Sequence, residues 1–214
     1  MQNIPISTKY MKRITFYTVL FIAFSCYQNK KEKPNTNSES ITNINEIVEA
    51  IIIQDSLDVF SKSKDSPMFC SELRKLNISI PEKNENGLIP PPPPRGIYIT
   101  RLLSDKIIGE RFSAKDSLFI LEQNSNPEKL KIKKKLLSKL NSITIEEALI
   151  KRKKSKKLFT FYEMTIPVFS IDRKKAYVEL DHHCSGLCGS GLAIYLKKIN
   201  GKWQIIEKWQ TWIS

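Results

Sequence analysis

The chain has 214 residues, 41% of them hydrophobic and 27% charged, and a formal net charge of +13. This length is sufficient for one well-buried domain, and the absence of an internal repeat excludes repeat architectures. The charge excess is local rather than spread over the chain, so it characterises one segment and not the whole protein.

Residues 14–25 form an apolar block between the basic pair Lys12–Arg13 and Cys26. The block is shorter than the roughly 20 apolar residues that a membrane-spanning helix needs, but basic-then-apolar order is typical of a secretion signal. We expect residues 1–25 to be a signal peptide, with Met11 as an alternative start. The end of the block resembles the lipobox of bacterial lipoproteins. That resemblance implies acylation of Cys26 and a lipid anchor in the cell envelope, in the outer membrane on its periplasmic or surface face.

Residues 26–42 are polar and lack apolar periodicity, which predicts a disordered tether between anchor and domain. Asn43 and Glu46 form a capping pair ahead of apolar residues at helical spacing, and we expect a helix from there to about Phe60. A single domain over residues 43–214 follows from this boundary.

The segment 70–80 is ambiguous between strand and irregular chain. Five consecutive prolines at 90–94 must be extended and lack backbone donors. We interpret them as a stiff surface connection that leads into a strand at 97–103. The alternative is a docking ligand for an aromatic groove.

Two capping boxes, Ser113 with Asp116 and Thr144 with Glu147, predict two further helices. The segment 129–140 between them is helical or partly strand-like. It opens a basic run, 129–157, with 12 Lys and Arg against two Glu. An exported protein meets no bulk nucleic acid, so the natural partners of such a run are lipid headgroups, lipopolysaccharide phosphates or acidic glycans. The alternative is a solvated helical face.

From residue 159 onward the chain alternates with the two-residue period of strands. Asn200–Gly201 is a strong hairpin signal because both residues tolerate a positive φ. We predict an α+β fold in which N-terminal helices pack on a curved antiparallel meander, of four strands or more, at 159–214. The expected strands are 161–171, 176–182, 192–199 and 203–213.

The segment 182–191 contains both histidines, His182 and His183, and two of the four cysteines, Cys184 and Cys188. Zinc would need four ligands, but on a strand His183 cannot share a face with its neighbours, so no metal site is predicted. Redox catalysis normally uses two cysteines separated by two residues at the start of a helix. Here three residues separate Cys184 from Cys188 and strands are expected on both sides, so a redox site is not predicted either. A structural Cys184–Cys188 disulfide suits an oxidising compartment and the glycines around it.

Cys70 is then left over, either buried or paired with one of the loop cysteines. The sequence contains none of the common motifs of known enzyme mechanisms. We therefore assign no catalytic residue and expect no cofactor. Glu163, Glu179 and Asp181 would form an acid–base group only if they faced a pocket, and we expect exposed strand carboxylates. Alternation places Trp203 and Trp209 on one sheet face and Trp212 on the other.

The C-terminal region from about Thr165 resembles that of a group of uncharacterised bacterial lipoproteins, through a Cys-Gly hairpin, a Gly-x-Trp strand and a terminal aromatic strand. The order of helices and strands is also similar to that of cystatin-like and nuclear-transport-factor-like folds. We expect a non-enzymatic envelope domain that binds a protein or anionic glycan, with His182, His183, Trp209 and Trp212 as candidate binding residues. The alternative is a small pocket enzyme with Asp, Glu or His as acid–base residues.

Overall fold

The computed structural model describes residues 36–63, 65–103, 111–155 and 158–214, and a compact unit comprises Ser40–Ser214. The expected signal peptide and Cys26 lie outside the described residues. Within them, no helix combines the length and apolar character needed to cross a membrane. The helices are α2 (Thr36–Gln54), α3 (Ile99–Leu102), α4 (Ser117–Glu122), α5 (Lys134–Leu137) and α6 (Ile145–Lys154). The strands are β1 (Met68–Cys70), β2 (Glu72–Arg74), β3 (Asn77–Ser79), β4 (Gly96–Tyr98), β5 (Lys129–Lys131), β6 (Ser142–Ile143), β7 (Thr160–Met164), β8 (Val168–Phe169), β9 (Lys175–Cys184), β10 (Ser190–Ile199) and β11 (Lys202–Ile213).

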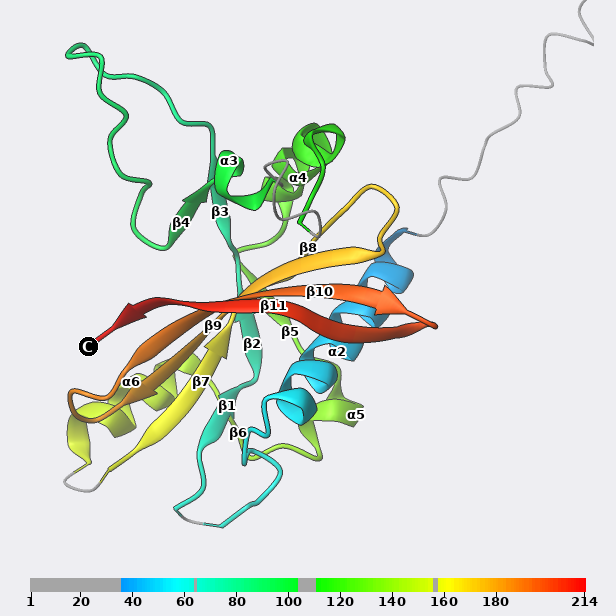
Figure 1. Cartoon of the computed structure of the whole chain (residues 1–214). Coiled ribbons are helices and arrows are strands. Elements are labelled where there is room, and N and C mark those ends of the chain that lie inside the picture. Colours follow the sequence, from blue (N-terminus) through cyan, green and yellow to red (C-terminus); the bar gives the residue numbers. More distant parts are fainter. Residues whose placement is uncertain (1–35, 64, 104–110, 156–157) are drawn as a thin grey trace, which may run out of the picture. The chain divides into compact units, whose positions relative to one another are not determined.

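The main sheet has the strand order β11-β10-β9-β7-β1-β6, with β8 also paired to β9 (Figure 1). Strands β7, β9, β10 and β11 are antiparallel, which confirms the predicted meander and the α+β class. Strand β1 adds in parallel between β7 and β6, so the sheet is mixed. Two small pairs, β2 with β5 and β3 with β4, flank it.

One face of the main sheet packs against α2. Buried residues of the helix, such as Ile47 and Ile51, meet Val178 and Leu180 of β9 and Ile194 of β10. Each of these side chains is almost fully withdrawn from water. Burial of this kind contributes about 25 cal/mol for each Å² of apolar surface, which makes this face the main source of stability.

The opposite face carries two smaller apolar clusters. Tyr177 and Tyr195 pack with residues of α3 and α4, including Leu102 and Ile120. Phe161 packs separately, with residues of β1, β6 and α6. The part of β9 between these clusters is therefore free to carry polar side chains on this face.

Helix α2 begins at Thr36 and ends at Gln54, rather than running from Asn43 to Phe60 as predicted. Residues 36–42, expected in the tether, are thus helical. The helix stops because Ser56 takes a left-handed conformation, with a φ of 52°. Ser56 N–H donates to the carbonyl of Ile53 and Leu57 N–H to that of Ile52, the two bonds of a Schellman cap. Glycine usually occupies this position, so a serine here does not indicate from the sequence that the helix ends.

The predicted strand at 97–103 is wrong beyond Tyr98, where the chain turns into α3. Ile99 and Leu102 are both buried, and their spacing of three suits a helix. The proline run is an exposed connection before β4, and Tyr98 Oη donates to the Pro90 carbonyl at 2.6 Å. The predicted strand 161–171 is interrupted between β7 and β8, where Pro167 has no N–H to donate.

Other local predictions are confirmed. The Thr144–Glu147 capping box starts α6, and the Ser113–Asp116 box starts a 3₁₀ turn (Ala114–Asp116) that leads into α4. Asn200 and Gly201 have φ values of 50° and 77°, as a type I′ hairpin requires. The ambiguous segment 70–80 contributes to three short strands, and 129–140 forms β5 and α5.

Candidate functional site

A pocket of about 440 Å³ opens on the second face of the sheet. Strand β9 supplies four residues to its wall: Tyr177, Glu179, Asp181 and His183. They are spaced by two, so their side chains all leave the strand on the same side. The wall is completed by β2, β4, β11, α3 and the connection before β4, through Arg74, Pro92, Arg95, Gly96, Ile97, Arg101, Trp209, Thr211 and Trp212.

Arg74, the last residue of β2, neutralises the carboxylates of this pocket. Its Nη2 lies 3.0 Å from Asp181 Oδ2 and 3.2 Å from Glu179 Oε2, and its Nε lies 3.9 Å from Glu163 Oε2. Only 11% of the Arg74 side chain is exposed. One buried guanidinium thus serves three carboxylates, and removing it would leave buried charges without their counter-ion.

Asp181 also fixes the indole of Trp212. Trp212 Nε1 donates to Asp181 Oδ1 at 2.9 Å, so both oxygens of this carboxylate are engaged. Gly191 on β10 makes room for the indole, because a methyl group at its Cα would overlap Trp212 Nε1. On the same wall, Tyr177 Oη donates to Glu179 Oε1 at 3.2 Å. The polar groups of the pocket are therefore held in place by one another.

Glu163 of β7 lies opposite Asp181 and beside His183. Its Oε2 is 3.4 Å from His183 Nε2 and 3.6 Å from Arg95 Nη2. These contacts are long, and both Glu163 Oε2 and His183 Nε2 are buried without a well-formed hydrogen bond. Arg95 itself follows the prolines with a left-handed φ of 57°, which brings its half-exposed side chain to the pocket. The imidazole stacks on Phe161 with ring centres 4.7 Å apart.

Two carboxyl groups of the cluster are shifted in opposite directions. Burial raises the pKa of Glu163, but the interaction with His183 and the charges of Arg95 and Arg74 outweigh it, so this pKa lies below its ordinary value. Burial dominates at Glu179 and raises its pKa, with the nearby charge of Asp181 acting in the same direction. The cluster therefore contains one carboxyl group that favours the ionised form and one that favours the protonated form.

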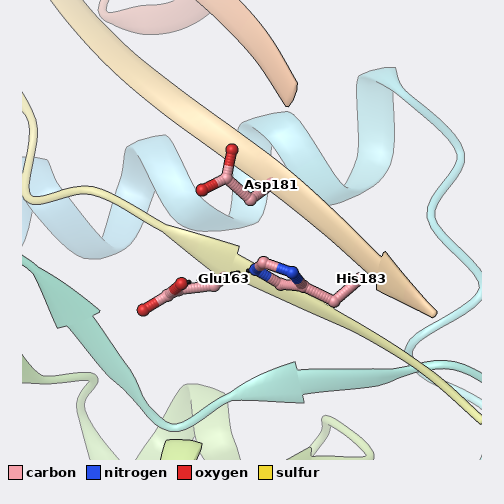
Figure 2. Close-up of side chains that lie close together, drawn as sticks. All are labelled: Glu163, Asp181 and His183. Carbon is pink, nitrogen blue, oxygen red and sulfur yellow. Dashed lines mark ion pairs between the residues drawn. The ribbon is translucent and has the colours of Figure 1, made fainter. Parts of the chain in front are cut away.

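Glu163, Asp181 and His183 bring one potential metal ligand each within 4.8 Å of one another (Figure 2). The donor set fits a cation poorly, however. Both Asp181 oxygens are already engaged, and the Arg74 guanidinium supplies positive charge at the position where a cation would need to bind. The arrangement thus favours an ion-pair cluster over a metal centre.

Of the four predicted binding residues, three line the pocket: His183, Trp209 and Trp212. His182 does not, because it leaves β9 on the opposite face and packs against Tyr162, with ring centres 5.0 Å apart. Burial lowers the pKa of His182.

The expectation of exposed strand carboxylates is wrong. Glu163 and Asp181 are buried, and the side chain of Glu179 is only 15% exposed. The reason is that β2 and the connection before β4 cover this part of the sheet and bring Arg74 and Arg95 to it.

The predicted distribution of the tryptophans is also wrong. Trp203 lies in the core beneath α2, near Phe169, whereas Trp209 stacks on Tyr195 on the pocket side. Two register shifts between β10 and β11, at Ile206 and Thr211, insert one extra residue each. Each bulge reverses the alternation, so Trp209 changes face relative to Trp203, and Trp212 stays on the side of Trp209.

Cys184 and Cys188 form the expected disulfide, with Cα atoms 5.8 Å apart, which removes them as metal ligands. Cys70 is buried and free, and burial raises the pKa of its thiol to about 12. Among the described residues this leaves an inert thiol in the core.

Sequence reasoning missed Arg74, Arg95 and Arg101. Nothing in their local sequence distinguishes them from other basic residues. A signal was present on β9, where Glu179 and Asp181 alternate with the apolar residues Val178 and Leu180. A row of charges on a strand that is apolar on its other side suggests a covered polar site, which requires a cation from elsewhere in the chain.

Comparisons of the chain with protein-family models, with curated proteins and with solved structures find no match, so the function is argued from this geometry.

Proposed function

We propose that this chain is a lipid-anchored cell-envelope protein whose domain binds an anionic glycan in the pocket of β9 and β11, without turning it over. The observation that carries the proposal is the combination, in one pocket of about 440 Å³, of two tryptophans with fixed groups of both charges. This volume falls within the range of small-molecule sites.

The lining suits a saccharide. Trp212 offers an aromatic surface against which the apolar face of a sugar ring can pack, and Trp209, whose ring packs against Tyr195 and the Arg111 guanidinium, also lines the pocket. Arginines and carboxylates side by side provide both donors and acceptors, which hydroxyl groups need. The exposed charges are those of Arg95 and Arg101, and they favour a ligand that carries a carboxylate or phosphate.

The site is also pre-organised. Asp181 holds both Arg74 and Trp212, and Tyr177 holds Glu179, so few side chains must be ordered when a ligand enters. A smaller ordering cost increases the affinity that a given set of contacts provides. The lipobox-like sequence up to Cys26 would place this site at the cell boundary, where acidic glycans occur.

A second candidate function is that of a small acid–base enzyme, favoured by the Glu163–His183 pair at 3.4 Å. A carboxylate beside one imidazole nitrogen orients the ring, as a general base requires. The pocket is open to solvent, which favours binding over this alternative, because a closed site is what strengthens acid–base chemistry.

The test is a titration of the full chain with envelope oligosaccharides, namely peptidoglycan fragments, lipopolysaccharide core and uronic-acid polymers, with product analysis after each incubation. We expect binding of an acidic saccharide without any product. Trp212→Ala should weaken binding at least about 10-fold, since an aromatic platform is lost. Phe60→Ala, which removes an exposed aromatic residue outside the pocket, is the matched control. Turnover that disappears in His183→Gln would instead establish the enzyme.

A further inference from the structure

A second surface, away from the pocket, lies at the end of α6. The last turn of this helix carries four consecutive basic residues, Lys151–Lys154, and all four are exposed. In the part of the chain that the structure describes, no acidic residue forms an ion pair with them. Positive charge at a helix C-terminus is favourable for the helix, but four unpaired charges exceed what capping requires.

The hairpin between β9 and β10 lies against this helix end. A shallow hollow of about 270 Å³ between them is lined by Leu149, Arg152 and Lys153 of α6 and by Ser185 and Gly186 of the hairpin. The hairpin is fixed in this position by two hydrogen bonds of 3.0 Å between Phe159 and Ser185 and by the Cys184–Cys188 disulfide. The helix end and the hairpin therefore form one continuous surface.

Large apolar side chains are exposed next to residues of this surface, because Leu187 follows Gly186 and Leu158 precedes Phe159, which is bonded to Ser185. Leu187, at the tip of the disulfide-closed hairpin, is 92% exposed, and Leu158 is 73% exposed. Leu149 of α6 is also exposed. Single exposed leucines are common, but three of them around an unpaired basic cluster, with one on a rigid tip, indicate an interaction site.

We propose that this docking surface, composed of Leu149, Arg152, Lys153, Leu158 and Leu187, seats the domain on an anionic lipid bilayer. The basic residues contact the headgroups, and Leu187 and Leu158 enter the boundary between headgroups and acyl chains. Both kinds of contact contribute to the membrane binding of peripheral proteins. A phosphate-bearing polymer would use the charges but leave the leucines in water, so a bilayer accounts for more of the surface. This proposal is independent of the pocket and its ligand.

The test uses residues 26–214 with Cys26→Ser, so that neither an acyl group nor the apolar block 14–25 contributes, and vesicles of phosphatidylcholine with and without phosphatidylglycerol. We expect binding that depends on phosphatidylglycerol and weakens with salt. Arg152→Gln combined with Lys153→Gln should weaken it about 30-fold, at roughly 1 kcal/mol for each charge. Leu187→Ser should weaken it about 10-fold, from the loss of one buried leucine side chain.

The controls match each change in chemistry and exposure. Leu118→Ser removes a leucine that is 74% exposed on α4, and Lys134→Gln with Lys135→Gln removes two exposed charges from α5. Neither should change vesicle binding by more than about twofold. Hydrogen exchange should slow on addition of vesicles at the end of α6 and at the hairpin.

The proposal is overturned if the controls weaken binding as much as the docking-surface variants do, or if vesicles protect other segments instead. It is also overturned if Leu187→Ser binds normally and soluble polyphosphate competes fully, because the partner would then be a polyanion and not a bilayer.

Discussion

The two faces of β9 carry opposite chemistry along the same ten residues. Ala176, Val178 and Leu180 on one face are buried in the main core beneath α2, while Glu179 and Asp181 on the other form a charged cluster around Arg74. The first face stabilises the fold by burying apolar surface, whereas the second must first remove charges from water. Burying the charges of the second face is therefore no gain in stability by itself, which supports the binding role proposed for this face.

The largest effect is expected when the shared cation of the polar face is removed. Arg74→Met leaves Glu163, Glu179 and Asp181 buried without it and should lower the free energy of unfolding by about 3 to 5 kcal/mol, measured by urea denaturation. Lys139→Met, which breaks an exposed ion pair with Glu49, is the control and should cost less than about 1 kcal/mol. An equal loss of unfolding free energy in both variants would mean that the buried ion pairs contribute no more to stability than an exposed one.

The apolar face should respond in stability but not in binding. Leu180→Ala creates a cavity in the main core and should cost about 3 kcal/mol, read from the same denaturation curves. Because Leu180 points away from the pocket, saccharide affinity of the folded variant should be unchanged. A parallel loss of affinity would show that the two faces are not independent.

A substitution at Gly191 changes the polar face more locally, at the indole of Trp212. Gly191→Ala forces the Trp212 indole from its hydrogen bond to Asp181 and should cost about 1 to 3 kcal/mol of stability through overpacking. Its larger consequence should be weaker saccharide binding in a titration. Gly186→Ala meets only Cys188 Sγ, at 3.9 Å, and should leave both quantities unchanged. Normal binding by Gly191→Ala would exclude Trp212 from the site.

The smallest expected effect is a difference in pH dependence between two carboxyl groups of the polar face, Glu163 and Glu179. The pKa of Glu163 is lowered in the folded chain, so its stabilisation is present above its ordinary value of 4.5 and is lost as the pH falls through the folded pKa. The pKa of Glu179 is raised, so its contribution is favourable below 4.5 and is lost as the pH rises through the folded pKa.

The unfolding free energies of Glu163→Gln and Glu179→Gln, measured against the unsubstituted chain from about pH 3 to about pH 7, should therefore diverge with opposite slopes. The advantage of the unsubstituted chain over Glu163→Gln should shrink toward acid, and its advantage over Glu179→Gln should shrink toward neutral pH. Parallel slopes would mean that both carboxyl groups are shifted in the same direction.

Local signals predicted most of the fold. The Thr144 capping box, the Asn200–Gly201 turn and the alternation after residue 159 are determined by neighbours in sequence, and the structure has each of them. The Ser56 cap and the two bulges of β11 were not predictable in this way. A serine accepts a left-handed φ only because the chain around it is held in place, and an extra residue in a strand leaves the sequence pattern almost unchanged.

The candidate site was only half predictable for the same reason. His183, Trp209 and Trp212 were named because their residue types are informative anywhere in a chain. Arg74 and Arg95 reach the pocket from segments whose position depends on tertiary structure, on β2 and after the proline run. Their role follows from where the carboxylates of β9 need a partner, which requires the packed sheet.

The most direct test of the pocket as the binding site is to follow the indole N–H signals of the three tryptophans by NMR while acidic envelope oligosaccharides are added to the full chain. The tryptophans sit on both faces of the sheet, so the protein contains its own control. We predict that the signals of Trp209 and Trp212 shift together and saturate, while that of Trp203 stays in place. Binding that leaves Trp209 and Trp212 unshifted, or that moves Trp203 equally, would contradict the account.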